Sequence, residues 1–472
     1  MSADIRSRSW WAPSTTRARW TVVGAVLLVA ALGVTTALVW ISPQTSPITG
    51  IDRATATVTR LVQAQSKADR LQKQVDALQK QIDSKNAKLV SQSSALGHAN
   101  SQLVLAQQQL QALQSSAAST PSAPAKPAAV TGRTTPVKPP LAPITAPSKQ
   151  ALLHPDSPYF GMYTQQAPFN WATYDATTAE IGAQTNLVGY FQGWDQPFRA
   201  DAVTRAWQHG QLPMMTWESR PIDDANNVVN APDYSLSKII DGNFDAYLHQ
   251  FAHDVAATGL PVAIRLDQEM NSIWYPWAET DGSGASINGN APGQFVQMWR
   301  HVHDIFEQEG ANANVIWDWS PNRVDNLPAT HQSAAYTASL YPGDDYVDWV
   351  GMSGYLRPPY TADQTFSFDE TFGRTLTQLR GITTKPIILS EVGASETEGH
   401  KATWITSFFQ GLNDPANADI IGFAWFDLAI TSYVEGVRQT NDWRIDSRPD
   451  SLAAFVAGLT APGGRFRLEP AS

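Results

Sequence analysis

The chain has 472 residues, with 33 Lys and Arg against 43 Asp and Glu, and it contains no cysteine. This length allows one large domain with additional segments. The first 150 residues carry a net charge of +11 and the remainder carries −21. The acidic character of the longer part argues against a nucleic-acid partner, which needs clustered positive charge. The lack of cysteine excludes disulfides, thiol nucleophiles and cysteine-ligated metal sites.

At the N-terminus, residues 20–41 form an apolar run that contains no charged side chain. About 20 apolar residues suffice to cross the hydrocarbon core of a bilayer. Four arginines precede the run, so the positive-inside rule predicts a cytoplasmic basic tail over 1–19, a transmembrane helix over 20–41 and an extracellular remainder. The alternative is a cleaved signal peptide, but the sequence Leu-Val-Trp-Ile-Ser-Pro at 38–43 is a poor cleavage site. We therefore predict a single-pass protein of the cell membrane.

Residues 52–114 carry apolar residues at a seven-residue repeat. One position of the repeat is occupied by Leu61, Ala68, Val75, Ile82, Leu89, Leu96, Leu103 and Leu110. This pattern predicts a coiled coil of two or more chains, and therefore a homo-oligomer. A single amphipathic helix lying on the membrane or on the folded domain is the alternative. Residues 115–150 are rich in Pro, Ala, Ser and Thr and lack aromatic residues, which predicts an extended linker.

Between residues 151 and 464, short apolar runs alternate with stretches that are long enough to hold a helix. The runs occupy 159–165, 185–194, 212–218, 261–269, 313–322, 347–355, 385–393 and 420–427. Continuous apolar strands that alternate with helices indicate a parallel sheet covered by helices. Eight such units over about 300 residues predict an α/β fold, the (β/α)8 barrel.

Polar residues near the ends of these runs define the expected site, because functional groups of such barrels gather at the carboxyl ends of the strands. Glu269 ends the fourth run and Glu391 lies at the end of the seventh, and these two strands face each other across the barrel mouth. Hydrolysis of a glycosidic bond uses two carboxyl groups, and a separation of about 5 Å is typical of retaining enzymes. We expect a raised pKa for the proton donor and a depressed pKa for the nucleophile.

The sequence RLDQEMNSIWYPW at 265–277 resembles the acid/base region of glycoside hydrolase family 26. The segments VIWDWSPN, DWVGMSGY, KPIILSEVG and WFDLAI…NDWRID resemble the same family in the same order, so that the resemblance covers residues 157–460. It implies a retaining enzyme on a (β/α)8 barrel that binds a polysaccharide, either β-1,4-mannan or mixed β-1,3/1,4-glucan. It implies neither a cofactor nor a metal.

The resemblance also implies the catalytic roles. Matched to the family motifs, Glu269 takes the role of acid/base and Glu391 that of nucleophile. Tyr355 matches the tyrosine that hydrogen-bonds the nucleophile. Glu218 ends the third run, and we interpret it as a structural or site-wall carboxylate. Arg265 belongs to the fourth run, and we expect it in the barrel interior beside Glu269.

Five further residues complete the predicted substrate-binding set together with Tyr355. Trp274 and Trp277 match aromatic residues that line the sugar subsites, and Trp425 matches the aromatic residue beneath the reactive sugar. Gln268 stands where the family usually has His, and its amide is expected to donate a comparable hydrogen bond to the substrate. Asn322 ends the fifth apolar run.

Two other functions stay open at the level of sequence. A non-catalytic glycan-binding or wall-organising surface protein would keep the tryptophans and the stalk, and a structural tether would depend on the coiled coil. The pair of glutamates favours the enzyme. His249 and His253 have metal-like spacing, but no acidic third ligand accompanies them, which favours a solvent-exposed helix face.

Overall fold

The computed structural model describes residues 144–222, 228–434 and 437–466. The predicted cytoplasmic tail, transmembrane helix and coiled coil lie outside these residues, as does the predicted linker up to residue 143. Within the described ranges, no helix combines the length and the apolar character that a membrane crossing requires.

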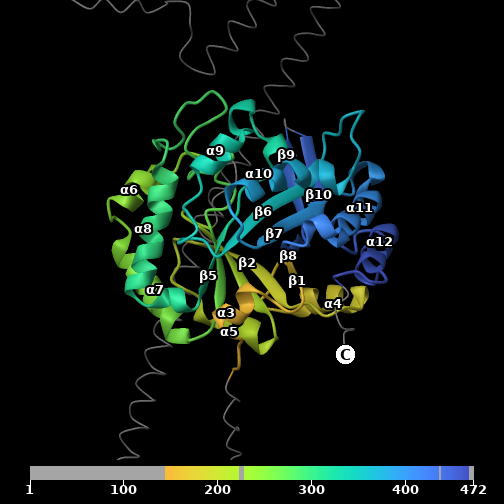
Figure 1. Ribbon diagram of the computed structural model, residues 1–472, viewed down its shortest axis with the longest axis horizontal. Coiled ribbons are helices and arrows are strands. Elements are labelled where there is room, and N and C mark those ends of the chain that lie inside the picture. The colour runs from red at the N-terminus through yellow and green to blue at the C-terminus, as the bar shows by residue number, and fades with distance from the viewer. Residues whose placement is uncertain (1–143, 223–227, 435–436, 467–472) are drawn as a thin grey trace, which may run out of the picture. The chain divides into compact units, whose positions relative to one another are not determined.

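Eight parallel strands close into a barrel, in which each strand pairs with the next along the chain and β8 pairs with β1 (Figure 1). They are β1 (Tyr159–Tyr163), β2 (Leu187–Gly193), β3 (Leu212–Glu218), β4 (Val262–Leu266), β5 (Val315–Trp319), β6 (Trp349–Leu356), β7 (Ile387–Ala394) and β8 (Ile420–Phe426). Each strand overlaps one of the eight predicted runs, so the predicted barrel is confirmed. An antiparallel hairpin of β9 (Ala429–Val434) and β10 (Val437–Asp442) follows β8.

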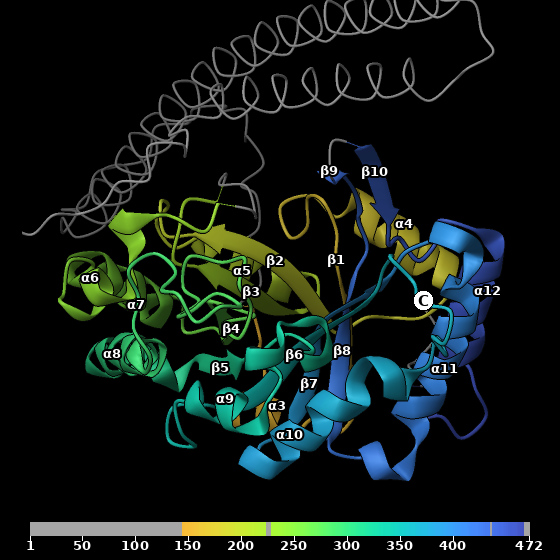
Figure 2. The same cartoon turned by 90° about the horizontal axis from the view of Figure 1, so that it is seen from above.

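Helices surround the barrel on its outside (Figure 2). They are α4 (Ala172–Ile181), α5 (Ala200–Gln208), α6 (Leu236–Ile240), α7 (Asp245–Thr258), α8 (Gln294–Gln308), α9 (Ala334–Ser339), α10 (Arg374–Ile382), α11 (Lys401–Asn413) and α12 (Pro449–Leu459). Short helical turns lie at η1 (Pro232–Tyr234), η2 (Ala311–Ala313), η3 (Val324–Asn326), η4 (Ala329–His331), η5 (Asp369–Gly373), η6 (Thr397–Gly399) and η7 (Pro415–Asn417). Left-handed glycines end α4 and α7, at Gly182 and Gly259.

Large aromatic side chains fill the layer between the barrel and its helices. The fully buried tryptophans include Trp217, Trp299, Trp317, Trp319, Trp349, Trp404 and Trp425. Trp217 of β3 stacks on Phe251 of α7 with ring centroids 4.2 Å apart. Most of the tryptophans that the sequence places after residue 170 therefore stabilise the fold by burying large apolar areas.

The ends of β4 and β5 differ from the predicted runs. β4 ends at Leu266 and β5 at Trp319, so Glu269 and Asn322 lie in the turns that follow these strands. After β4 the backbone leaves the extended conformation, since Asp267 and Glu269 have φ values of 44° and 56°. Both predicted ends are therefore corrected by three residues.

The end of β7 also needs a correction. Glu391 lies inside this strand, because Val392, Gly393 and Ala394 continue to pair with β6. Its side chain is nevertheless at the mouth of the barrel, where it meets Tyr355 of β6.

The folded domain begins earlier than the predicted boundary at residue 151. A short helix, α3 (Lys149–Leu153), begins inside the predicted linker and is capped by the Ser148 hydroxyl. Lys149 forms a 2.8 Å ion pair with Asp348, and Leu152 is buried. The last residues of the Pro-rich segment therefore belong to the barrel domain.

Gly161 of β1 lies so close to β2 that a methyl group at this position would be 2.0 Å from the Leu187 carbonyl oxygen. We expect Gly161→Ala to lower the free energy of unfolding by about 1–3 kcal/mol, because the strands must move apart. Gly381 of α10 is the matched control, since a methyl group there meets nothing within 4 Å and alanine favours a helix. Urea unfolding followed by circular dichroism compares the two variants. Equal stability of both would contradict the packing argument.

Candidate active site

Glu391 is held by hydrogen bonds to both of its carboxylate oxygens. Oε2 accepts a 2.6 Å hydrogen bond from Nη1 of Arg265, and Oε1 accepts a 2.5 Å hydrogen bond from the Tyr355 hydroxyl. Arg265 of β4 has no solvent exposure and also donates to the hydroxyls of Ser320 and Ser353. Because the guanidinium is fixed by its neighbours, it fixes the orientation of the Glu391 carboxylate in turn.

The ionisation of Glu391 differs from the expectation for a nucleophile. Burial is the largest influence and raises the pKa of Glu391; the Arg265 charge lowers it, the Glu269 charge raises it and the Tyr355 hydrogen bond lowers it. The net direction is upward. The predicted depressed pKa is therefore wrong in direction, because the loss of hydration outweighs the ion pair with Arg265.

Glu269 lies in the turn after β4, in a conformation that glutamate rarely adopts. Its backbone N–H donates a 2.7 Å hydrogen bond to the Ser320 carbonyl oxygen, and its Oε2 accepts a 2.9 Å hydrogen bond from the Trp274 indole. Its φ of 56° belongs to the left-handed region. Such strain persists only where the surrounding structure imposes it, and it concentrates at functional sites.

The two carboxylates belong to one electrostatic site. The charge of Glu269 raises the pKa of Glu391. Tyr275 lies in the same field: burial raises its pKa, and the charges of Glu269, Glu218 and Glu391 raise it further. The barrel thus brings together the two glutamates that the sequence places on the fourth and seventh units. Their separation of about 5 Å stays a prediction.

Two of the predicted sugar-binding tryptophans do not line the site. Trp277 and Trp425 are both 0% exposed. The Trp277 ring stacks on Tyr275 and its Nε1 donates to the Gln268 carbonyl oxygen, whereas Trp425 packs on Phe455 of α12. The prediction for these two residues is corrected, because their faces are covered by the protein itself. Trp274 is only half-buried and contacts Glu269 directly.

The prediction that Gln268 contacts the substrate is also corrected. Its side chain is 1% exposed, and its Nε2 donates a 2.7 Å hydrogen bond to Oε1 of Glu218. Glu218 in turn forms a buried 3.0 Å ion pair with Arg220. The amide that was expected to reach the substrate is thus committed to a buried charged cluster, and Glu218 has a structural role.

Asn322 contributes to the site through its backbone, which binds the Asn271 side chain. Its N–H donates to the side-chain oxygen of Asn271 at 2.8 Å, and its carbonyl oxygen accepts from the Asn271 amide nitrogen at 2.9 Å. The predicted substrate contact of its side chain stays a prediction.

The sequence did not single out Trp443 and Phe426, which lie beside Tyr355. The Tyr355 ring centroid is 5.4 Å from that of Trp443 and 5.9 Å from that of Phe426. Trp443 follows the hairpin, and its N–H donates to the Leu428 carbonyl oxygen. The NDWRID segment is part of the family resemblance, but the path of this loop does not follow from the order of the strands.

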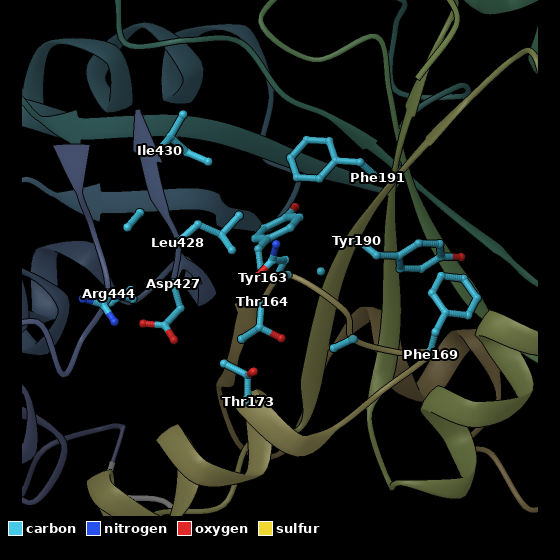
Figure 3. A pocket seen from close by; sticks show the side chains of 14 residues that line it. Tyr163, Thr164, Phe169, Thr173, Tyr190, Phe191, Asp427, Leu428, Ile430 and Arg444 are labelled. Atoms are coloured by element: carbon cyan, nitrogen blue, oxygen red, sulfur yellow. The ribbon is translucent and has the colours of Figure 1, made fainter. Parts of the chain in front are cut away.

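A cavity of about 550 Å³ adjoins this aromatic group at the ends of β1, β2 and β8 (Figure 3). Figure 3 shows Phe191 and Phe169 on one side of the cavity and Ile430 and Arg444 on the other. The Tyr163 ring lies 5.2 Å from Phe191 and 6.0 Å from Phe426. The volume is in the range of small-molecule binding sites.

The two histidines that the sequence singled out, His249 and His253, lie on α7. Nδ1 of His249 lies 2.8 Å from the Oε1 acceptor of Glu309, and His253 is exposed. Across the described parts of the chain, no group of three or more His, Asp or Glu side chains is arranged to hold a metal ion.

Two carboxylates at the mouth of a (β/α)8 barrel are the arrangement that glycoside hydrolases use. Comparison with known families agrees with this class. The model of glycosyl hydrolase family 26 matches residues 192–423, so the family predicted from the sequence is confirmed.

Individual relatives are more distant. Endoglucanase H of Acetivibrio thermocellus is 32% identical over 287 residues, which are 59% of this chain and 28% of that protein. Mannan endo-1,4-beta-mannosidase of Bacillus subtilis is 25% identical over 227 residues, which are 47% of this chain and 53% of that protein. The chain therefore spans about a quarter to a half of these curated relatives. The solved structure of GH26C from Muricauda sp. is 18% identical, covers 68% of this chain and 92% of that chain, and has a TM-score of 0.46.

Removal of the Tyr355 hydroxyl tests the balance of forces at Glu391. Its hydrogen bond lowers the pKa of Glu391, so Tyr355→Phe should raise this pKa further. Titration of ¹³C-labelled glutamate side chains by NMR measures the change. Tyr346→Phe, a half-buried tyrosine beside Arg300, is the control and should leave the Glu391 titration unchanged. A lower pKa in Tyr355→Phe would contradict the assigned direction.

Proposed function

We propose that the protein is a retaining glycoside hydrolase that cleaves internal β-linkages of a neutral polysaccharide by double displacement. The observation that carries the proposal is the Glu391 carboxylate, whose two oxygens are held by Arg265 and Tyr355 in the field of Glu269. One carboxylate fixed for attack and a second one near it are the two groups that this reaction needs.

In the first step, Glu391 attacks the anomeric carbon while Glu269 protonates the oxygen of the leaving sugar. The bond to that oxygen breaks, and an ester bond between the sugar and Glu391 forms. The Trp274 indole occupies Oε2 of Glu269, so Oε1 is the oxygen that carries the proton. Arg265 and Tyr355 keep the attacking carboxylate in one orientation, which lowers the entropic part of the barrier.

In the second step, the Glu269 carboxylate takes a proton from a water molecule. The water oxygen attacks the anomeric carbon, the ester bond to Glu391 breaks, and both carboxyl groups return to their starting states. Two inversions at the same carbon give a product with the anomeric configuration of the substrate.

The proposed substrates are β-1,4-mannan and mixed β-1,3/1,4-glucan. The family resemblance supports them, and relatives in the same family are an endoglucanase and a mannan endo-1,4-beta-mannosidase. The cavity at the ends of β1, β2 and β8 also supports a chain-like substrate. Phe169 and Phe191 offer apolar faces on which further sugar rings can stack beyond the cleaved bond.

Substitution of the two glutamates tests the proposal. Glu269→Ala should lower kcat/KM on polysaccharide by about 10²–10⁴-fold, and Glu391→Ala should lower it by at least as much, because general acid/base and nucleophilic catalysis are lost. Glu309→Ala, which removes only the partner of His249, is the control. Reducing-sugar release from mannan and mixed-linkage glucan is the measurement. Glycan binding without cleavage by the unaltered protein would instead favour the binding-protein alternative.

Proton NMR of the first products tests the stereochemistry. We expect the β-anomer to form first and to equilibrate later, because double displacement retains the configuration. Initial appearance of the α-anomer would show that Glu391 is not a nucleophile.

We also propose that residues 20–41 anchor the enzyme in the cell membrane, with the N-terminus cytoplasmic, the barrel extracellular and residues 52–114 forming a homo-oligomeric coiled coil. The charge-free apolar run, the preceding arginines and the seven-residue repeat support this arrangement.

Alkaline extraction of cell membranes should leave the full chain in the pellet and release a chain that lacks residues 1–41. Sedimentation of residues 42–472 should give an oligomer, and that of residues 115–472 a monomer. An equal number of chains per particle in the two samples would refute the coil.

A further inference from the structure

The turn that carries Glu269 is strained at two positions. Asp267 and Glu269 are non-glycine residues with φ values of 44° and 56°. Left-handed conformations of such residues cost free energy and need support from their surroundings. The backbone N–H of Glu269 donates to the Ser320 carbonyl oxygen, and the Glu269 carbonyl oxygen accepts from the Ser272 N–H at 2.8 Å. Asp267 is held in addition by its N–H, which donates to the Trp217 carbonyl oxygen, and by Ser219, which donates to its carboxylate. These bonds anchor the start of the turn, and the residues after Glu269 need an anchor of their own.

Asn271 supplies the anchor. Its side chain is fully buried, its Nδ2 donates to the Asn322 carbonyl oxygen at 2.9 Å, and its Oδ1 accepts from the Asn322 N–H at 2.8 Å. Because the amide faces one donor and one acceptor of the same residue, only one orientation of the amide satisfies both. The Asn271 carbonyl oxygen also accepts a 2.9 Å hydrogen bond from Nδ1 of His331. Asn271 therefore ties the turn after β4 to the turn after β5.

The same connection continues to the nucleophile. Asn322 forms a bridge with Ser353 of β6, and the Ser353 hydroxyl accepts a hydrogen bond from Arg265. Arg265 in turn binds Glu391. The support of the Glu269 turn and the support of the Glu391 carboxylate thus meet at Asn322 and Ser353.

We propose that Asn271 is a positioning residue for the proton transfers of Glu269, acting through the turn and not through contact with the substrate. The inference rests on the proposed function. Loss of the Asn271 amide frees the turn to relax toward an ordinary backbone conformation, which moves the Glu269 carboxyl group away from the leaving oxygen. Only steps that need a proton from Glu269, or a proton taken by it, then become slower.

Asn290 provides a matched control in the same loop. It is a buried asparagine whose amide makes three hydrogen bonds, to the Pro276 and Ala278 carbonyl oxygens and from the Leu236 N–H, against two for the Asn271 amide. None of these partners belongs to the turn after β5. Asn271→Ala and Asn290→Ala therefore remove comparable buried amides, and only the first removes the connection to Asn322.

The two variants are compared on two kinds of substrate. The first is the polysaccharide that the unaltered enzyme cleaves, whose leaving group must be protonated. The second is the 2,4-dinitrophenyl β-cellobioside or β-mannobioside with added azide, because the leaving group needs no proton and azide replaces the water that Glu269 must deprotonate. Asn271→Ala should lower kcat/KM on the polysaccharide by roughly 10- to 100-fold and on the activated glycoside with azide by less than about threefold. Asn290→Ala should change both by the same factor.

Equal losses of Asn271→Ala on both substrates, matching those of Asn290→Ala, would overturn the proposal and leave Asn271 a purely structural residue. Full polysaccharide activity of Asn271→Ala would overturn it as well. Absence of hydrolysis by the unaltered enzyme would instead reject the proposed function, so the two failures are distinguishable.

A measurement independent of activity is the indole N–H resonance of Trp274, assigned from its loss in Trp274→Phe. This N–H donates to Glu269, so displacement of the carboxyl group must change its chemical shift. We expect the resonance to move in Asn271→Ala and to stay in place in Asn290→Ala. An unmoved resonance in folded Asn271→Ala would overturn the proposal even if both variants were less stable.

Discussion

Arg265 lies inside the barrel with no solvent exposure, and its charge is paired with the carboxylate of Glu391. A buried guanidinium needs an acceptor for each of its donors, because an unpaired buried charge is far more costly than an exposed one. The hydroxyls of Ser320 and Ser353 supply two of these acceptors and Glu391 supplies a third. Ser320 follows β5, Ser353 lies on β6 and Glu391 lies on β7, so the one guanidinium on β4 connects four neighbouring strands. The geometry of the site at the barrel mouth depends on these connections.

The same burial sets the ionisation of Glu391, the proposed nucleophile. Loss of hydration raises the pKa of Glu391 more than the Arg265 charge lowers it, so the ion pair fixes the geometry of the carboxylate without making it unusually acidic. Glu269 stands in a different environment, on a strained turn and in contact with the Trp274 indole. The two carboxyl groups are therefore held in different ways. Glu391 is held by the Arg265 charge and by the pairing of β7, whereas Glu269 is held by a turn that is anchored to the turn after β5.

The barrel and the pair of glutamates could be predicted from the sequence, because eight apolar runs with polar ends indicate the number and order of the strands and which ends share a face. The aromatic residues could not be predicted as well. Trp425 and Phe426 are neighbours on β8, and a one-residue difference decides which of them faces the helices and which faces the mouth. Trp443 arrives on a loop after a hairpin, and Gln268 is drawn into the Glu218 cluster, which strand order does not reveal.

The central claim is that Glu391 forms a covalent bond with the sugar. The test uses the 2,4-dinitrophenyl 2-deoxy-2-fluoro-β-glycoside of glucose or mannose. Its fluorine slows both steps, but its good leaving group keeps the first step faster than the second, so the ester intermediate accumulates during incubation. Mass spectrometry of proteolytic peptides should place one fluoroglycosyl group on the peptide that contains Glu391 and on its glutamate. A label on Glu269 or on any other carboxylate, or time-dependent turnover without a label on any peptide, would contradict the account.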